Sequence, residues 1–473
     1  MAGRLLTCWL VIAMSAAAPA PARELYVNWE TGDDSAAGEE GSPLRTIAQA
    51  VKRAGPGDTI HLAPTDTPWP EVAGFYDKSG EPGRPITLDG HGATLSGADP
   101  LDPAKWEQVR PGLYRGAPPV SADPAVIGRW YFLFDGVMNR MGRSLKGPHP
   151  AWKLPDALEP GEWTWVEGEQ VLYLRTPGDR PLADCDIRAP MRSNGVSVAG
   201  RCEHLVIRDL TATHVYNDGY NIHGYCRDVL FQNVRAIECG DDGISAHDDC
   251  QIAVDGLVSM GNSTGVCHVG ASQSVSDHLY IARNHGVDYY VLNSGTHVLR
   301  NSHIVCDAAQ SVVVIGDDEP GGVCTLQMDN VLVQGTGASE LIKANKRSVV
   351  DAARVTFHGL SLSVAGDAFA LRRSVVAGEP KPYIIVYPHT RWQAEGNLYD
   401  LQYLRVADTF YKAADLGAYQ AATGQDAGTL WAPVQFAEPF DGRILSPEVE
   451  GGVGADLSLL PRLPGPEEEN AAP

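Results

Sequence analysis

Three cysteines, Cys202, Cys226 and Cys250, are spaced 24 residues apart, and the residues around them repeat with the same step. Gly219 and Gly243 follow the same spacing. A repeat of this length predicts a solenoid, in which each repeat forms one coil that stacks on the previous coil. Side chains 24 positions apart in the chain then become neighbours at the spacing of paired strands, about 4.8 Å.

Short apolar strand cores within the repeats indicate which kind of solenoid forms. They lie at 205–207, 229–231, 252–254 and 279–281. An Asp or Asn follows each core closely, as Asp209 and Asn233 do, and these residue types tolerate the left-handed backbone of a tight corner. Short strands joined by tight turns predict an all-β fold, a right-handed parallel β-helix.

The first 22 residues have the features of an export signal. Arg4 precedes a short apolar stretch at 5–14, and Ala20-Pro21-Ala22 matches an A-x-A cleavage site. The apolar stretch is too short to span a bilayer. We therefore expect a secreted or periplasmic protein whose mature chain begins at Arg23.

Changes in sequence pattern divide the rest of the chain. Ser42 as N-cap, followed by an apolar face over 44–54, predicts a helix that covers the open end of the solenoid. Five of the ten tryptophans fall in a stretch without the repeat, and 162–174 has the pattern of a β-hairpin. We predict these parts: 1–22 signal peptide, 23–100 N-terminal cap and first coils, 101–185 inserted β-rich subdomain, 186–376 β-helix core, 377–473 C-terminal cap and disordered tail.

The formal net charge of −22 disfavours binding to nucleic acid and to anionic membranes. We expect neither as a partner, and we expect a monomer. Eight cysteines lie between Cys185 and Cys324, and their spacing favours packed thiols with one or two disulfide bridges. The chain has no C-x-x-C pair, so no zinc site of that type is expected, and we predict no metal ligands among the site residues.

The repeat brings acidic residues of two consecutive coils together. Asn217-Asp218-Gly219 aligns with Asp241-Asp242-Gly243 at a step of 24 residues. Asp218 should therefore stack on Asp242, and Asn217 on Asp241.

The strand that follows each acidic motif adds a polar strip beside the carboxylates. Alternation along the strand points Tyr220 and Ile222 inward. It points Asn221 outward with Ser245, and His223 outward with His247. We predict Asn217, Asn221, His223, Ser245, His247 and the more distant Lys343 as substrate-binding residues.

Carboxylates one coil apart repel each other when both are ionised, so one pKa should rise. A protonated acid beside an ionised carboxylate is the pair that glycosidic hydrolysis requires. We predict Asp218, Asp241 and Asp242 as catalytic residues. Asp and Asn are also common at structural turns, and a calcium site made of the same acids is a further alternative, although no cofactor is required for hydrolysis.

The two acidic motifs, Asn217-Asp218-Gly219 and Gly240-Asp241-Asp242, resemble those of polygalacturonase-type glycoside hydrolases in the pectate-lyase-like β-helix superfamily. The resemblance implies that Asp218, Asp241 and Asp242 carry the hydrolysis. The next coil has Ser263-Thr264-Gly265 where that family has Gly-His-Gly. The hairpin and the N-terminal helix are similar to those of exported bacterial β-helix proteins, including β-xylosidase-like and fucosidase-like hydrolases, which implies carbohydrate processing.

The sequence thus favours an exported polysaccharide-active enzyme, a glycoside hydrolase. Two alternatives stay open. One is a uronate polysaccharide lyase that uses Lys343 as its base together with calcium. The other is a β-helix that binds glycans without catalysis.

Overall fold

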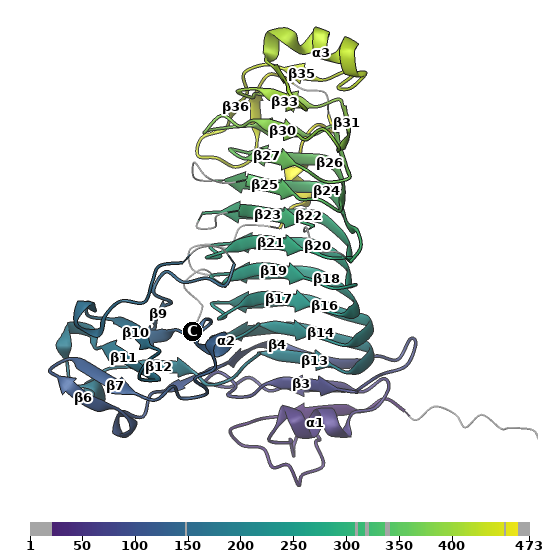
Figure 1. Ribbon diagram of the computed structural model, residues 1–473. Coiled ribbons are helices and arrows are strands. Elements are labelled where there is room, and N and C mark those ends of the chain that lie inside the picture. The colour runs from purple at the N-terminus through teal and green to yellow at the C-terminus, as the bar shows by residue number, and fades with distance from the viewer. Residues whose placement is uncertain are drawn as a thin grey trace, which may run out of the picture.

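The computed structural model describes residues 21–146, 149–307, 311–316, 321–335, 341–448 and 451–461. Most of the predicted signal peptide and most of the predicted disordered tail lie outside these ranges. Two long sheets made almost entirely of parallel strands stack coil upon coil along one axis (Figure 1). The prediction of an all-β parallel β-helix is confirmed.

The larger sheet is built in this order: β1 (Glu24–Val27), β2 (Thr59–Leu62), β4 (Ile86–Ser96), β14 (Arg201–Thr213), β16 (Tyr225–Ile237), β18 (Asp249–Met260), β20 (Gln273–Ala282), β22 (Thr296–Cys306), β24 (Cys324–Gly335), β26 (Ser348–His358), β29 (Val375–Ala377), β32 (Leu398–Tyr399) and β35 (Leu430–Trp431). Beside this path, β28 (Ala368–Arg372) pairs with β26, and β31 (Arg391–Glu395) pairs with β28.

The second sheet is built in this order: β3 (Ala73–Tyr76), β13 (Val196–Ala199), β15 (Tyr220–Ile222), β17 (Asp242–Ala246), β19 (Thr264–His268), β21 (Val287–Val291), β23 (Ser311–Ile315), β25 (Leu341–Ala344), β27 (Ser361–Val364), β30 (Ile384–Val386), β33 (Leu404–Val406) and β34 (Thr409–Tyr411). A short pair, β36 (Gln435–Phe436) and β37 (Ile444–Ser446), lies outside both sheets. The parallel coils therefore continue well beyond residue 376.

The register of the strands follows the repeat seen in the sequence. Cys202 pairs with Cys226, and Cys226 pairs with Cys250. Tyr220 and Ile222 pair with the equivalent residues one coil later, and both are fully buried, as predicted. All three paired cysteines are buried thiols, and no disulfide forms among the described residues, so the expectation of one or two bridges was wrong.

A helix at each end of the stack covers the core. Helix α1 (Ile47–Arg53) lies beneath the first coils, and α3 (Leu416–Thr423) lies over the last (Figure 1). Helix α1 begins later than predicted, because Thr46 and not Ser42 is its N-cap. Leu44 instead forms a parallel bridge with Val27, which keeps the preceding residues extended.

An inserted unit stands beside the coils (Figure 1). It contains two antiparallel sheets: β10 (Glu162–Val166), β11 (Val171–Arg175), β7 (Leu113–Gly116) and β6 (Glu107–Arg110) in one, and β5 (Ala98–Pro100), β12 (Ile187–Pro190), β8 (Phe132–Phe134) and β9 (Val137–Asn139) in the other. A short helix, α2 (Pro124–Ile127), precedes β8. The core of the inserted unit buries four tryptophans: Trp106, Trp130, Trp163 and Trp165. No helix among the described residues is long and apolar enough to cross a membrane.

Candidate active site

A column of glycines sets the spacing of the coils beside the acidic residues. A Cβ atom added to Gly219 would lie 2.8 Å from the carbonyl oxygen of Gly243, and one added to Gly243 would lie 2.6 Å from that of Gly265. Only glycine allows the backbones to approach this closely. Asp218 and Asp242 directly precede two of these glycines, so the column holds the two acids in register.

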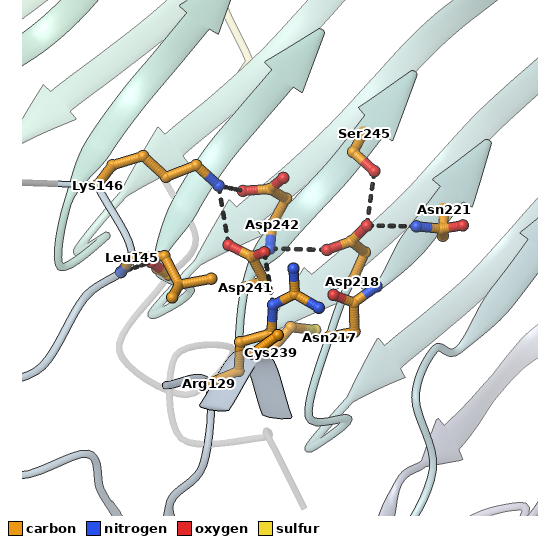
Figure 2. Close-up of polar contacts among 12 residues, drawn as sticks. Arg129, Leu145, Lys146, Asn217, Asp218, Asn221, Cys239, Asp241, Asp242 and Ser245 are labelled. Atoms are coloured by element: carbon orange, nitrogen blue, oxygen red, sulfur yellow. Dashed lines mark hydrogen bonds and ion pairs between the residues drawn. The ribbon is translucent and has the colours of Figure 1, made fainter. Parts of the chain in front are cut away.

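Asp218 lies at the centre of the acidic cluster and is 2 % exposed. Its Oδ2 accepts hydrogen bonds from Ser245 Oγ and Asn221 Nδ2, each at 2.6 Å (Figure 2). Its Oδ1 accepts the backbone N–H of Asp242 at 3.1 Å. The Asp218 carboxylate is therefore in direct contact with the backbone of the next coil.

The inserted unit supplies cations to the other two carboxylates. Lys146 Nζ lies 2.8 Å from Asp241 Oδ1 and 2.6 Å from Asp242 Oδ1 (Figure 2). Arg129 Nε lies 3.1 Å from Asp241 Oδ2. Asp241 and Asp242 are 4 % and 3 % exposed, so the ion pairs lie in a largely desolvated environment. Asp241 and Asp242 therefore share two cations that come from outside the β-helix.

Further contacts fix the inserted unit over the acids. Ser144 Oγ lies 3.1 Å from Ser263 Oγ, and the backbone N–H of Leu145 donates to the same Ser263 oxygen at 3.1 Å. The buried guanidinium of Arg140 donates to the carbonyl of Cys239. Lys146 is therefore held over the cluster by its immediate neighbours in sequence.

Burial and mutual repulsion shift the ionisation of the cluster. Burial, and then the charge of Asp241, raise the pKa of the Asp218 carboxyl. Burial and Asp242 also raise the pKa of Asp241, while Lys146 and Arg129 act in the opposite direction. Burial lowers the pKa of Lys146, but the two acids outweigh this and hold its pKa well above the usual value. The lysine therefore remains charged, and burial and the charge of Asp241 favour the protonated form of Asp218.

The predicted imidazole column forms next to the acids. The rings of His223 and His247 stack with centroids 4.1 Å apart and planes 13° apart. Burial, followed by the neighbouring His223, lowers the pKa of His247 to about 4. His223 Nδ1 lies 3.4 Å from Asp248 Oδ2 at the exposed edge. The inner imidazole is therefore neutral near pH 7 and can donate or accept one hydrogen bond.

Two other predicted residues, Asn217 and Ser245, differ in how far they are buried. Asn217 donates to Asn194 Oδ1 at 2.9 Å and is half-buried. Ser245 is fully buried, and its hydroxyl is committed to Asp218, so it orients the carboxylate and does not face solvent. Ser245 has the outward position that alternation predicts, but Asp218 covers it and keeps it from solvent.

Lys343 lies on the same sheet but away from the cluster. The outward column runs from Ser245 through Cys267, Tyr290 and Val314 to Lys343. Four steps between paired strands correspond to about 19 Å. The sheet therefore gives Lys343 the same facing direction as Ser245 without bringing it to the acids.

Three residues of the site could share a cation. Asp218, Asp242 and His247 each offer a ligand atom, and these atoms lie within 4.8 Å of one another. Calcium requires six to eight oxygen ligands. The ammonium of Lys146 lies within hydrogen-bonding distance of Asp242, where it already balances charge. With Lys146 in this position the described residues do not fit a calcium ion, and calcium remains an untested prediction.

Sequence reasoning missed Lys146 and Arg129, which lie 95 and 112 positions before Asp241. Neither residue belongs to the repeat, so the coil register says nothing about them. The one available signal was that the insertion interrupts the β-helix just before the coils that carry the acids.

Comparisons with known proteins give few matches. A family model described as a protein of unknown function (DUF1565) matches residues 30–97. No curated protein sequence matches. Among solved structures, the chain is similar to a complex of XylC with xylose (11 % identity, 86 % of this chain and 82 % of that chain, TM-score 0.45).

Two further solved structures are similar to the chain at comparable sequence identity and TM-score. One is a glycoside hydrolase (10 % identity, 92 % of this chain and 99 % of that chain, TM-score 0.46). The other is the pectate lyase Pel9A (14 % identity, 93 % and 96 %, TM-score 0.41). At this level of similarity, a functional proposal has to depend on the geometry of the site itself.

Proposed function

We propose that the protein is an exported, polysaccharide-active enzyme, and specifically a glycoside hydrolase. The observation that carries the proposal is the convergence of Asp218, Asp241 and Asp242 from two adjacent coils. One of these acids is disposed to hold a proton, and the other two are paired with cations. Hydrolysis of a glycosidic bond needs this division between an acid and an ionised carboxylate.

In this proposal Asp218 is the general acid. Its raised pKa favours the protonated form, and Ser245 and Asn221 fix its orientation. Asp242 is the partner that activates water or attacks the anomeric carbon, and the ammonium of Lys146 balances its charge until substrate binds. Asp241 holds Lys146 and Arg129 in place and adds negative charge where an oxocarbenium-like transition state develops.

Substrate reaches the acids when the Lys146 side chain leaves them. A sugar hydroxyl or the attacking water then takes the hydrogen-bonding position of the ammonium on Asp242, and the glycosidic oxygen lies at Asp218. Asn217, Asn221, His223 and His247 form the polar strip that would bind the neighbouring sugar hydroxyls. We propose a polysaccharide or oligosaccharide as the only partner, a monomeric state, and a secreted or periplasmic location.

The lyase alternative is less well supported by the geometry. A lyase base has to be neutral and close to the reacting carbon. Lys343 lies about 19 Å along the sheet from the acids. Lys146 is close to them, but its raised pKa keeps it protonated. Neither lysine has both the position and the charge state that a base at this site needs.

A substrate screen tests the proposed class. The purified mature chain is incubated with neutral plant and algal glycans and with polygalacturonate and alginate. New reducing ends are measured together with ultraviolet absorbance, because only a lyase produces an unsaturated sugar. We expect reducing ends without absorbance, and we expect the Asp242→Asn variant to lose this activity on every accepted glycan.

Two results would contradict the proposal. An unsaturated product from a uronate polymer would establish a lyase. Cleavage by Asp242→Asn at the wild-type rate would show that the reacting groups lie elsewhere. The circular dichroism spectrum and melting temperature of the variant verify that it is folded, so that lost activity is attributed to the carboxylate.

A further inference from the structure

Tyr76 is a large aromatic residue that is 62 % exposed, and it lies on the sheet that carries the acidic cluster. It is the last residue of β3. In this sheet β13 and β15 separate β3 from β17, the strand on which Asp242 lies (Figure 1). The sheet therefore extends from the acids to Tyr76 without interruption.

The strand register places Tyr76 in line with the stacked imidazoles. Tyr76 pairs with Ala199 of β13, and one step further along the sheet the same column reaches His223. His247 follows, with its ring stacked on that of His223. Two steps between paired strands separate Tyr76 from His223, about 10 Å. The column therefore has a ring side chain at each end and only the methyl group of Ala199 between them.

The backbone beneath Tyr76 leaves room for its ring. A Cβ atom added to Gly74 would lie 2.5 Å from Cε2 and 3.2 Å from the hydroxyl oxygen of Tyr76. The phenol therefore leans back along β3 and occupies the space above Gly74, which only glycine leaves free. Gly74 pairs with Ser197, and Ser197 pairs with Asn221. The ring thus lies in line with Asn221, which donates a hydrogen bond to Asp218.

Hydrogen bonds fix the polar groups between Tyr76 and the acids. Asn194 Nδ2 donates to Ser197 Oγ at 3.0 Å, and Asn217 Nδ2 donates to Asn194 Oδ1 at 2.9 Å. These amides connect β13 with the coil that carries Asp218. Groups that are ordered in the free protein reduce the entropic cost of binding a ligand.

The charges along this part of the sheet favour a neutral ligand. The outward positions from β3 to β17 contain no lysine or arginine: Gly74, Tyr76, Ser197, Ala199, Asn221, His223, Ser245 and His247. Exposed carboxylates follow at the ends of β3 and β17, where Asp77 and Asp248 lie. Arg201, at the start of β14, is paired with Glu203 at 2.7 Å. A uronate would therefore meet like charge at both ends of this surface.

We propose that Tyr76 stacks against a sugar ring of a neutral oligosaccharide whose next sugars extend along the sheet to Asp218. This inference rests on the proposed glycoside hydrolase function. In pyranoses such as glucose and xylose the hydroxyls project from the rim of the ring, and the faces present C–H groups. An aromatic side chain packs against such an apolar face. Asn221 and His223 then offer hydrogen-bonding groups to the hydroxyls at the rim.

Calorimetric titration tests Tyr76 without depending on cleavage. The protein carries Asp242→Asn, so that a bound chain is not cut, and it is titrated with cellohexaose and with xylohexaose. We expect at least one of these to bind, and we expect Tyr76→Ala in the same background to weaken its affinity by about five-fold. Gly74→Ala should also weaken binding, because the new Cβ displaces the ring. Tyr76→Phe retains the ring and should bind within about two-fold of the background.

Phe410→Ala in the same background is the matched control. Phe410 is also an exposed aromatic residue of this sheet, 58 % exposed, but it lies on β34 at the opposite end. We expect this control to bind as the background does. Circular dichroism verifies that each variant is folded.

Three results would overturn the inference: no binding of either hexasaccharide, equal affinity in the background and Tyr76→Ala, or tighter binding of hexagalacturonate than of both neutral chains. A failure of the proposed hydrolase activity gives a different result. In that case the wild type cleaves no glycan, while the affinity measured by titration still depends on Tyr76.

Discussion

Lys146 Nζ lies 2.6 Å from Asp242 Oδ1, although 96 positions separate the two residues in the chain. The contact joins the inserted unit to the β-helix at the acidic cluster. Removing one partner of a buried ion pair leaves an uncompensated charge, which costs roughly 3–5 kcal/mol. This ion pair therefore couples the stability of the protein to the electrostatics of the proposed active site.

Replacing Lys146 by Met should lower the free energy of unfolding by roughly 3 kcal/mol, at the low end of that range because Arg129 still contacts Asp241. Urea denaturation measures the change. Lys153→Met is the matched control, since its ion pair with Glu162 is more exposed and should contribute less than about 1 kcal/mol. Equal losses in the two variants would contradict the importance assigned to Lys146.

Without the Lys146 ammonium, the acidic cluster should bind another cation. We expect millimolar Ca²⁺ to raise the melting temperature of Lys146→Gln and to leave that of the wild type unchanged. The reason is that in the variant Asp241 and Asp242 lose the ammonium that balances their charge, while Asp218 remains next to them. Differential scanning fluorimetry measures both melting temperatures. A Ca²⁺-dependent rise in the melting temperature of the wild type would show that Lys146 does not occupy the position of a cation.

The raised pKa of Asp218 predicts a pH dependence of stability. The folded state binds the proton more tightly than the unfolded chain, whose Asp pKa is about 3.9. Stability from this group is therefore lost as pH rises through the raised pKa and regained as pH falls toward 4. In urea denaturation between pH 7 and pH 4, the wild type should gain stability relative to Asp218→Asn as pH falls. A constant difference would contradict the shift.

His247 should remain neutral down to about pH 4, because burial and His223 lower its pKa. Proton NMR of the imidazole follows its titration directly. The His223→Asn variant removes a neighbouring positive charge and should raise the His247 pKa, though not to 6.5, since burial remains. A His247 that titrates near 6.5 in the wild type would contradict the lowering of its pKa by burial and by His223.

The glycine column predicts a steric effect at the same site. A Cβ at Gly243 would lie 2.1 Å from Ser259 Oγ and 2.6 Å from the Gly265 carbonyl oxygen. Gly243→Ala should therefore lower the free energy of unfolding by about 2–3 kcal/mol. Gly168→Ala, where the new atom meets nothing within 4 Å, should change it by less than about 0.5 kcal/mol. Thermal denaturation compares the two variants.

The fold could be predicted because a constant step defines which residues pair. The 24-residue spacing of Cys202, Cys226 and Cys250 is reproduced in the strand register, and it places Asp218 against Asp242. Local capping was less predictable, since Ser42 and Thr46 are both good N-caps and a bridge between Leu44 and Val27 decides between them.

The site was only partly predictable, because its two cations come from outside the repeat. Lys146 and Arg129 reach the acids through the tertiary packing of the inserted unit. Ser245 has the outward position that alternation predicts, but Asp218 covers it. Alternation fixes the direction of a side chain, whereas exposure depends on what packs over it.

The most direct test of the central claim is the catalytic efficiency of Asp218→Asn on a glycan that the wild type cleaves. Loss of a general acid should lower kcat/KM by at least about 100-fold. The control is Asp228→Asn, which removes an exposed carboxylate on β16 that touches His204 and not the cluster. We predict a large loss in the first variant and wild-type efficiency in the control. Wild-type efficiency in a folded Asp218→Asn protein would show that the acids of these two coils are not the catalytic centre.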